Sequence, residues 1–191
     1  MIKTGIFGGS FNPIHNAHIA LARKIKELAG LDEVWFVVSP HNPLKDADGL
    51  MPDDLRLQMV REALQGENGL VASDYEFRLP RPSYMLHTLQ SMSRDYPDRE
   101  FSLIIGADNW SCFNRWMGYK EILANYNIYV YPRKGSVVDA SALPPNVKLL
   151  DTGLYNLSST QIRQLIREGK TVAEFVPQCV SSRLSSSDFL K

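Results

Sequence analysis

The sequence predicts an α/β fold: a Rossmann-like, doubly wound, mostly parallel sheet with a small C-terminal helical part. Three observations support this class. Strand-like and helix-like patterns alternate along the chain, the run VWFVV at 34–38 is apolar throughout, and clusters of glycine, proline and polar residues follow the strand-like runs. Such alternation favours a sheet with helices on both faces. A continuously apolar strand is typical of a parallel sheet that is buried on both sides.

The first half of the chain carries three expected strands. A β-prone run at 2–7 comes first, the apolar run 34–38 second, and a weaker run at 70–72 third. Apolar residues recur at helical spacing over 14–29, where Gly30 ends the pattern, and over 52–64, which Pro52 opens. A further helix is expected over 84–92.

The second half continues the alternation with three more expected strands, at 101–105, 128–131 and 147–150, and a short helix at 120–124. Helices are then expected over 158–168, which Gly169 ends, and over 172–184, with a break at Pro177. We expect residues 1–191 to form a single domain. Its C-terminal helical part would span about 158–187, and 188–191 would fray.

Composition limits the class of protein. Hydrophobic residues make up 44% of the chain, which suffices for a core, and 21 basic residues balance 21 acidic ones, so no general attraction to nucleic acid follows. Cys112 and Cys179 match no metal or redox spacing. No signal-peptide core appears at the N-terminus, and no apolar run approaches the roughly 20 residues of a membrane span. We expect a cytoplasmic protein without nucleic-acid or membrane partners, and leave a homo-oligomer open.

The stretch GIFGGSFNPIHNAH (5–18) places a glycine turn between an expected strand and an expected helix. It matches neither G-x-G-x-x-G nor G-x-x-x-x-G-K-[ST]. Gly8 and Gly9 let a ligand approach the backbone, while Asn12 suits the helix cap and Pro13 its first turn. The free N–H groups and the helix dipole then make an anion site.

His15 and His18 are three residues apart on that helix, so both lie on one side of its first turns. A helix N-terminus alone disfavours protonated imidazoles, but a bound polyphosphate would favour them. We therefore expect both histidines to contact phosphate. Two alternatives stay open. The histidines lie on the helix surface without a role, or they bind zinc, for which no further ligand stands out.

Two motifs carry a resemblance to a known family. GGSFNPIHNAH is similar to the G-G-[ST]-F-[DN]-P-x-H-x-x-H pattern of nucleotidyltransferases, and LSSTQIR is similar to their second motif, [IL]-S-S-T-x-[IV]-R. With SPHNPLK, SYMLHTL and GADNW in the expected order, the chain resembles the bacterial nicotinate-nucleotide adenylyltransferases from about residue 3 to 177. The resemblance implies a reaction of ATP with nicotinate mononucleotide that gives deamido-NAD and pyrophosphate.

The resemblance also assigns the ATP side of the site. His18 would contact the α-phosphate in the transition state and His15 the outer phosphates, with Arg163 as a third catalytic residue. In-line phosphoryl transfer needs such positioning and neutralisation of charge. The further residues expected to bind ATP are Gly8, Gly9, Ser10, Phe11, Gly106, Asp108, Arg133, Ser159 and Thr160.

Several of these assignments have simpler alternatives. Ser159 and Thr160 start a helix whose N–H groups would hold phosphate, or the segment SST at 158–160 is an ordinary helix N-cap. Arg163, one turn further on, is a charge-assisted donor to phosphate. Asp108 follows a strand and would accept from ribose hydroxyls. A helix cap by Asp108 is the simpler alternative, and the two roles are compatible. Arg133 adds positive charge near ATP, or it belongs to an exposed basic pair.

The mononucleotide side is assigned by the same resemblance to Lys45, Ser83, Tyr84, Met85 and Trp116. Lys45 would reach the phosphate, unless it is a simple loop lysine. Trp116 would stack on the pyridine ring, and main-chain N–H groups of the turn 83–85 would receive its carboxylate. For the nearby Trp110 a core role is the better interpretation. Mg²⁺ is expected with ATP, held by phosphates and water, without a dedicated protein ligand.

The chain departs from the family pattern at two positions, and neither removes a group that the mechanism needs. Ala17 stands where many relatives have glycine, and Asn12 replaces the commoner aspartate. Related families fit less well. Pantetheine-phosphate adenylyltransferases have T-x-x-H, cytidylyltransferases a different C-terminal motif, and class I aminoacyl-tRNA synthetases a K-M-S-K-S segment. The alternatives that stay open are an adenylyltransferase that prefers nicotinamide mononucleotide and a non-catalytic nucleotide-binding regulator.

Overall fold

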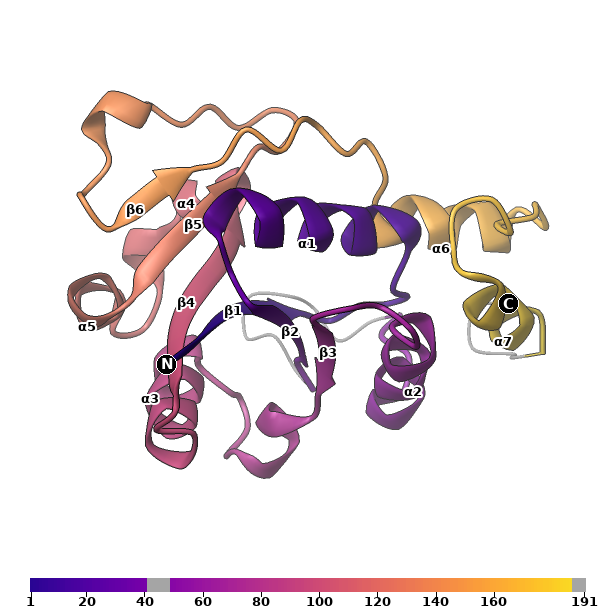
Figure 1. Cartoon of the computed structure of the whole chain (residues 1–191). Helices are drawn as coiled ribbons and strands as arrows, with labels where there is room; N and C mark the ends of the chain where they lie inside the picture. The colour runs from indigo at the N-terminus through magenta and orange to yellow at the C-terminus, as the bar shows by residue number, and fades with distance from the viewer. Residues whose placement is uncertain (41–48, 187–191) are drawn as a thin grey trace.

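In the computed structural model, which describes residues 1–40 and 49–186, six strands form one sheet (Figure 1). Every neighbouring pair is parallel. The strand order reverses between the two central strands, and in such sheets ligands bind beyond the carboxyl ends of the strands at that point. The predicted fold class is confirmed. In spatial order, the strands are β3 (Leu70–Ser73), β2 (Glu33–Val38), β1 (Ile2–Gly9), β4 (Arg99–Gly106), β5 (Asn127–Tyr131) and β6 (Val147–Leu149).

Helices cover both faces of this sheet, as the side chains of β2 show. Val34, Phe36 and Val38 belong to one core, together with α1 (Asn16–Ala29), α2 (Asp53–Ala63), α6 (Ser159–Arg167) and α7 (Gln178–Ser186). Trp35 and Val37 belong to the other, together with α3 (Met85–Asp95), α4 (Ala107–Ser111) and α5 (Tyr119–Asn125). Successive side chains of a strand point to opposite faces, so two buried faces require a strand that is apolar throughout.

The start of α1 differs from the expectation. The prediction that Asn12-Pro13 opens a helix at residue 14 is wrong, because the helix begins at Asn16 with His15 in the N-cap position. The Asn12 side chain instead donates to the Gly49 carbonyl at 2.9 Å and accepts from the Met51 N–H at 3.0 Å. These bonds tie the glycine turn after β1 to the segment before α2.

The C-terminal part is helical in two pieces. The prediction of a helix from 172 is wrong: α7 begins at Gln178, and before it the Phe175 N–H donates to the Val172 carbonyl in a turn. Pro177 explains the boundary, since proline disfavours a helical conformation in the residue before it. The sequence analysis also missed α4 and three short 3₁₀ helices, which are too brief to show a period. These are Tyr75–Arg78, Phe113–Arg115 and Ala140–Ala142. Residues 188–191, expected to fray, lie outside the described ranges.

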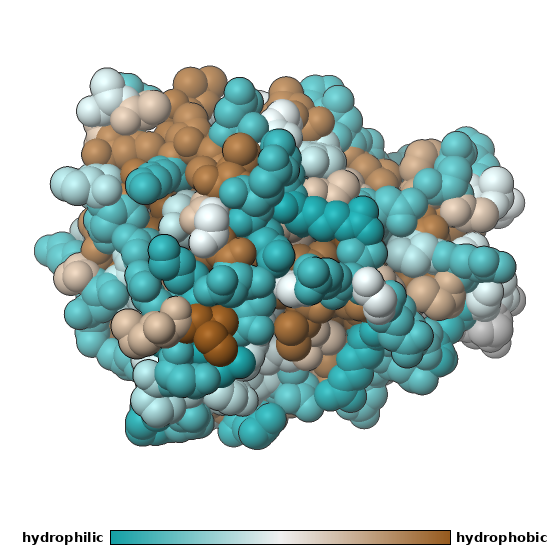
Figure 2. Space-filling model, viewed as in Figure 1, coloured by the Kyte–Doolittle hydropathy of each residue, from teal (hydrophilic) through white to brown (hydrophobic). Residues whose placement is uncertain are grey.

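The surface is mainly hydrophilic on the face in Figure 2, with hydrophobic side chains gathered at the upper left, in the region where Figure 1 places β6. In the described parts of the chain, no helix is both long and apolar enough to cross a bilayer.

Candidate active site

Two cavities meet at the carboxyl ends of β1 and β4. We call the first, of about 340 Å³, the histidine cavity; it is lined by the glycine turn, the start of α1 and the start of α6. The second, of about 380 Å³, is the aromatic cavity, lined by the turn 83–85 and by Trp116 among others. Some residues line both cavities, so the two lie side by side, and we refer to them together as the cleft. Adjoining cavities suit a ligand in two parts. The shared residues are Phe7, Gly8, Gly9, Asn109 and Tyr131.

The structure brings together nearly all residues expected to bind ATP. The histidine cavity is lined by Gly8, Gly9, Ser10, Phe11, His15, His18, Asp108, Arg133, Ser159, Thr160 and Arg163. Gly106 is the exception, because it lines the aromatic cavity instead. The departure noted at position 17 also lies here, since Ala17 lines the same cavity.

His15 and His18 stack at the start of α1. Their ring centroids are 3.6 Å apart and their planes differ by 19°. The backbone N–H of His15 donates to Nδ1 of His18 at 3.2 Å. Since Nδ1 accepts this bond, the proton of the neutral His18 ring is on Nε2.

The surroundings of His15 disfavour its protonated ring. Burial, and after it the positive charge of Arg133, lower the pKa of His15 from 6.5 to about 4. Its side chain lies in the N-cap position, only 3% of the residue is exposed, and Nδ1 has no hydrogen-bond partner within the described ranges. An anion in the histidine cavity would supply both a partner and the opposite charge, and would favour the protonated ring.

Helix α6 reaches the glycine turn from the far end of the chain. Its N-cap is Ser158, so the segment SST does cap the helix through its first serine, while Ser159 and Thr160 are the first two helical residues. Ser159 Oγ donates to the Pro13 carbonyl at 2.9 Å, and Arg163 Nη1 donates to the Asn12 carbonyl at 2.8 Å. Both bonds hold the backbone that leads into the histidine motif.

The same helix keeps donors for a ligand. Arg163 Nη2 donates to Thr160 Oγ1 at 3.2 Å, while Arg163 Nε is buried without a partner among the described residues. The N–H groups of Ser159 and Thr160 belong to the first turn of α6, where no intrahelical acceptor exists. An arginine and a helix N-terminus on one wall are suited to bind phosphate.

Asp108 and Arg133 lie beside each other at the edge of the histidine cavity, with Nε of Arg133 3.6 Å from Oδ1 of Asp108. The alternative that Asp108 caps a helix is wrong, because Gly106 is the N-cap of α4 and Asp108 lies in its first turn. A Cβ at Gly106 would lie 2.4 Å from Asp108 Oδ1 and 2.9 Å from Arg133 Cγ. Glycine at this position therefore lets both side chains pack against the strand end.

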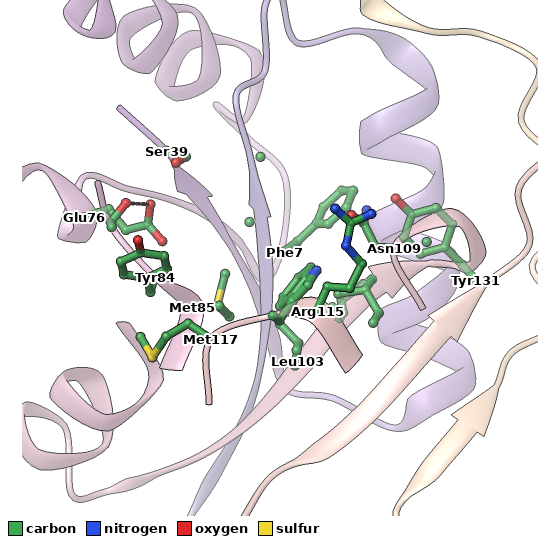
Figure 3. Close-up of a pocket in the computed structure, with 17 residues that line it drawn as sticks. Phe7, Ser39, Glu76, Tyr84, Met85, Leu103, Asn109, Arg115, Met117 and Tyr131 are labelled. Carbon is green, nitrogen blue, oxygen red and sulfur yellow. Dashed lines mark hydrogen bonds between the residues drawn. The ribbon is translucent and has the colours of Figure 1, made fainter. Parts of the chain in front are cut away.

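The aromatic cavity lies beyond the glycine turn, on the side of α3. Figure 3 shows Tyr84, Met85 and Met117 on one side of it and Arg115 and Tyr131 on the other. Its lining also includes Trp116, whose indole N–H is buried without a partner in the described part of the chain. Trp110 packs against the second core and lines neither cavity, as the core interpretation requires.

Glu76 supports the turn 83–85 from the protein interior. Ser83 Oγ donates to Glu76 Oε2 at 2.7 Å, and Thr88 Oγ1 donates to Glu76 Oε1 at 2.9 Å. Glu76, Ser83 and Thr88 are all buried. This carboxylate fixes the turn against the first residues of α3, whose N–H groups have no intrahelical acceptor.

Sequence reasoning missed several residues that line the cleft. Asn109 follows β4 and Tyr131 ends β5, so the rule that ligands bind at strand ends points to both. Glu76 and Arg115 lie in short 3₁₀ helices that no periodicity reveals. Lys45, expected to reach the mononucleotide phosphate, lies outside the described residues.

Comparison with known proteins decides the family. The sequence matches the family described as Cytidylyltransferase-like over residues 6–165. A curated protein of Bacteroides fragilis, named probable nicotinate-nucleotide adenylyltransferase, is 52% identical over 95% of this chain and 90% of its own length. One of the same name from Bacteroides thetaiotaomicron is 49% identical over 92% of this chain and 87% of its own. The chain belongs to the nicotinate-nucleotide adenylyltransferase family. The resemblance inferred from the two sequence motifs is confirmed.

Solved structures of the nicotinate-nucleotide adenylyltransferase family share the fold. Plasmodium falciparum nicotinic acid mononucleotide adenylyltransferase complexed with NaAD superimposes with a TM-score of 0.81, at 18% identity over 97% of this chain and 96% of its own. A putative nicotinate-nucleotide adenylyltransferase from Vibrio parahaemolyticus gives a TM-score of 0.71, at 24% identity over 97% and 99%.

Proposed function

We propose that the chain transfers the adenylyl group of ATP to nicotinate mononucleotide and releases pyrophosphate. A phosphate oxygen of the mononucleotide attacks the α-phosphorus of ATP, and the bond from that phosphorus to the bridging oxygen of pyrophosphate breaks. The product is nicotinate adenine dinucleotide. The observation that carries this proposal is that a cavity lined by His15, His18 and Arg163 adjoins a cavity lined by Trp116, with Gly8 and Gly9 in both linings.

On the ATP side, charge neutralisation is the main task, because phosphoryl transfer needs positioning and electrostatics rather than covalent help. His18 presents an N–H at Nε2 for the α-phosphate. His15, which gains a proton as the anion binds, contacts the outer phosphates together with Arg163 and the start of α6. Asp108 accepts from the ribose hydroxyls, and Arg133 adds positive charge beside it.

On the mononucleotide side, a flat ring fits the aromatic cavity. Trp116 stacks on the pyridine ring. Main-chain N–H groups at Ser83, Tyr84 and Met85 donate to the ring carboxylate, and Glu76 keeps that turn in place. Lys45 is the proposed contact to the mononucleotide phosphate.

Mg²⁺ enters this scheme bound to ATP, with phosphate and water oxygens as its ligands. The described residues hold no group of three or more metal-ligating side chains. The remaining proposals are a cytoplasmic location, a single nucleotidyltransferase domain, and no nucleic-acid or membrane partner. A homo-oligomer stays open.

The direct test is a pyrophosphate-release assay with ATP, Mg²⁺ and a panel of acceptors, with the dinucleotide product identified by mass. We expect release with nicotinate mononucleotide and little with phosphopantetheine. Release that is highest with nicotinamide mononucleotide would favour the amide-preferring alternative. Binding of ATP without any turnover would favour the non-catalytic regulator.

A further inference from the structure

Arg56 is a charged side chain in the protein interior that the proposed reaction does not use. It lies on α2 and is 0% exposed, and it is among the largest side chains that the fold buries completely. Burying a guanidinium is costly unless all its donors find acceptors. The position of those acceptors therefore indicates what the residue does.

All five N–H groups of Arg56 are used. Nε donates to the Met51 carbonyl at 2.9 Å. Nη1 donates to the carbonyls of Ser10 at 2.6 Å and Ser39 at 2.8 Å, and Nη2 donates to the Pro40 carbonyl at 3.1 Å and to Asp53 Oδ1 at 2.7 Å. Ser10 follows β1, and Ser39 and Pro40 follow β2. One side chain thus holds the carboxyl ends of two adjacent strands.

The bond to Ser10 fixes the orientation of a peptide group at the histidine cavity. The Ser10–Phe11 peptide is trans, so its carbonyl and its N–H point in opposite directions. With the carbonyl held by buried Arg56, the Phe11 N–H points away from Arg56. Phe11 lines the histidine cavity, and its N–H donates to no main-chain carbonyl among the described residues.

Phe11 also needs support for its backbone. Its φ of 44° is in the left-handed region, which a bulky side chain seldom adopts. The preceding carbonyl is bound by Arg56, and the following side chain, Asn12, is bound to Gly49 and Met51. Contacts on both sides of the residue hold the unfavourable conformation.

We propose that Arg56 is a positioning residue that orients the Ser10–Phe11 peptide, so that the Phe11 N–H donates to the polyphosphate of ATP. The inference rests on the proposed function for the identity of the ligand. Arg56 does not touch the nucleotide itself. Asp53 assists, since it balances the charge of Arg56 through Oδ1 and pairs with Arg81 through Oδ2 at 2.9 Å.

The test compares Arg56→Lys with the unaltered full-length protein. Lysine keeps the charge but has three donors in place of five, so at least two of the acceptors lose their bond. Affinities are measured by calorimetry for adenosine and for an ATP analogue with a methylene group between the α- and β-phosphorus. We expect the analogue to bind about 10- to 10²-fold more weakly, the scale of one lost hydrogen bond to a charged group, and adenosine to bind within about twofold of the unaltered protein. A merely structural role would weaken both ligands alike, and that result would overturn the inference.

The matched control is Arg61→Lys on the same helix, because Arg61 is exposed and pairs with Asp74 at 2.9 Å. It should change neither affinity. A second measurement does not depend on how the variant folds: in the ¹⁵N-labelled unaltered protein, the amide proton of Phe11 should move downfield with the analogue and not with adenosine. An analogue that binds without moving this resonance would contradict the inference alone, while failure of the unaltered protein to bind the analogue would contradict the proposed function as well.

Discussion

The rings of His15 and His18 stack 3.6 Å apart, and the backbone N–H of one residue holds the ring of the other. The backbone N–H of His15 therefore orients the His18 ring, and each ring packs against the other. Two stacked imidazoles repel each other when both are protonated. A bound polyphosphate would favour the protonated ring of His15, so we expect ligand binding and proton uptake by His15 to be coupled at this site.

The first prediction concerns that coupling. An NMR titration of the ligand-free protein should give a pKa for His15 near the value of about 4 that burial and Arg133 impose. Addition of tripolyphosphate should raise the pKa, because the anion favours the charged ring. A pKa near 6.5 that does not respond to the anion would contradict the role of His15.

The same shift has a consequence for stability. The folded pKa of His15 lies below the unfolded value of 6.5, so the unfolded chain binds a proton first as the pH falls. The contribution to the free energy of unfolding, at most about 3 kcal/mol, is present above pH 6.5 and is lost between pH 6.5 and about 4. Urea unfolding across this range should show the loss in the native protein, and much less of it in His15→Gln.

The second prediction is that His18 serves the transition state more than ground-state binding. His18→Ala should lower kcat about 10²–10³-fold, the scale for one lost electrostatic donor, with a smaller change in KM for ATP. His87→Ala, which removes an exposed histidine of α3, is the control and should leave kcat unchanged. Steady-state kinetics give kcat and KM for both variants. A near-normal kcat for His18→Ala would contradict a transition-state role for His18.

The third prediction separates the two halves of the cleft. Arg163→Ala should weaken ATP binding by about tenfold or more, because a charge-assisted donor to phosphate is lost, and should leave mononucleotide binding within about twofold. Arg167→Ala on the same helix is the control, since that side chain is exposed. Calorimetry with each substrate alone provides the comparison. The reverse pattern would show that the halves are assigned to the wrong ligands.

The fourth prediction concerns the support beneath the turn 83–85. Glu76→Ala removes the acceptor of the buried Ser83 hydroxyl and leaves Thr88 Oγ1 with the longer bond to the Tyr84 carbonyl at 3.3 Å, so the free energy of unfolding should fall by about 2 kcal/mol. The exposed Glu27→Ala should change it by less than about 0.5 kcal/mol. KM for the mononucleotide should rise in Glu76→Ala while KM for ATP changes little. An equal rise in both KM values would contradict a local role for Glu76.

The fold could be predicted well because its signals are local. The apolar run of β2 requires two covered faces, and Gly30 and Gly169 follow the ends of α1 and α6 as expected. The start of α1 could not be predicted, because Asn12 has a good capping side chain but uses it for Gly49 and Met51, which lie far away in sequence.

The candidate site likewise has a part that the sequence predicted and a part that it did not. Motifs at the two ends of the chain pointed to the glycine turn and to α6, which the structure places on one cavity. The role of Arg56 could not be found, because four of its five acceptors are main-chain carbonyls, and those of Ser10 and Ser39 lie 46 and 17 residues away. The fifth, Asp53, is an ordinary helical ion-pair partner. A buried arginine on a helix looks like a surface residue in the sequence.

The most direct test of the central claim is the ratio of kcat/KM for nicotinate mononucleotide to kcat/KM for nicotinamide mononucleotide, at matched ATP and Mg²⁺. A turn of main-chain N–H donors favours a carboxylate, whereas a carboxamide presents its NH₂ to at least one of them, at a cost on the order of 1–3 kcal/mol. The account predicts a preference for the acid of about tenfold to a few hundredfold. Trp116→Ala should impair both substrates, because stacking does not depend on the carboxylate. Equal values, or a preference for the amide, would contradict the assignment of nicotinate mononucleotide as the substrate.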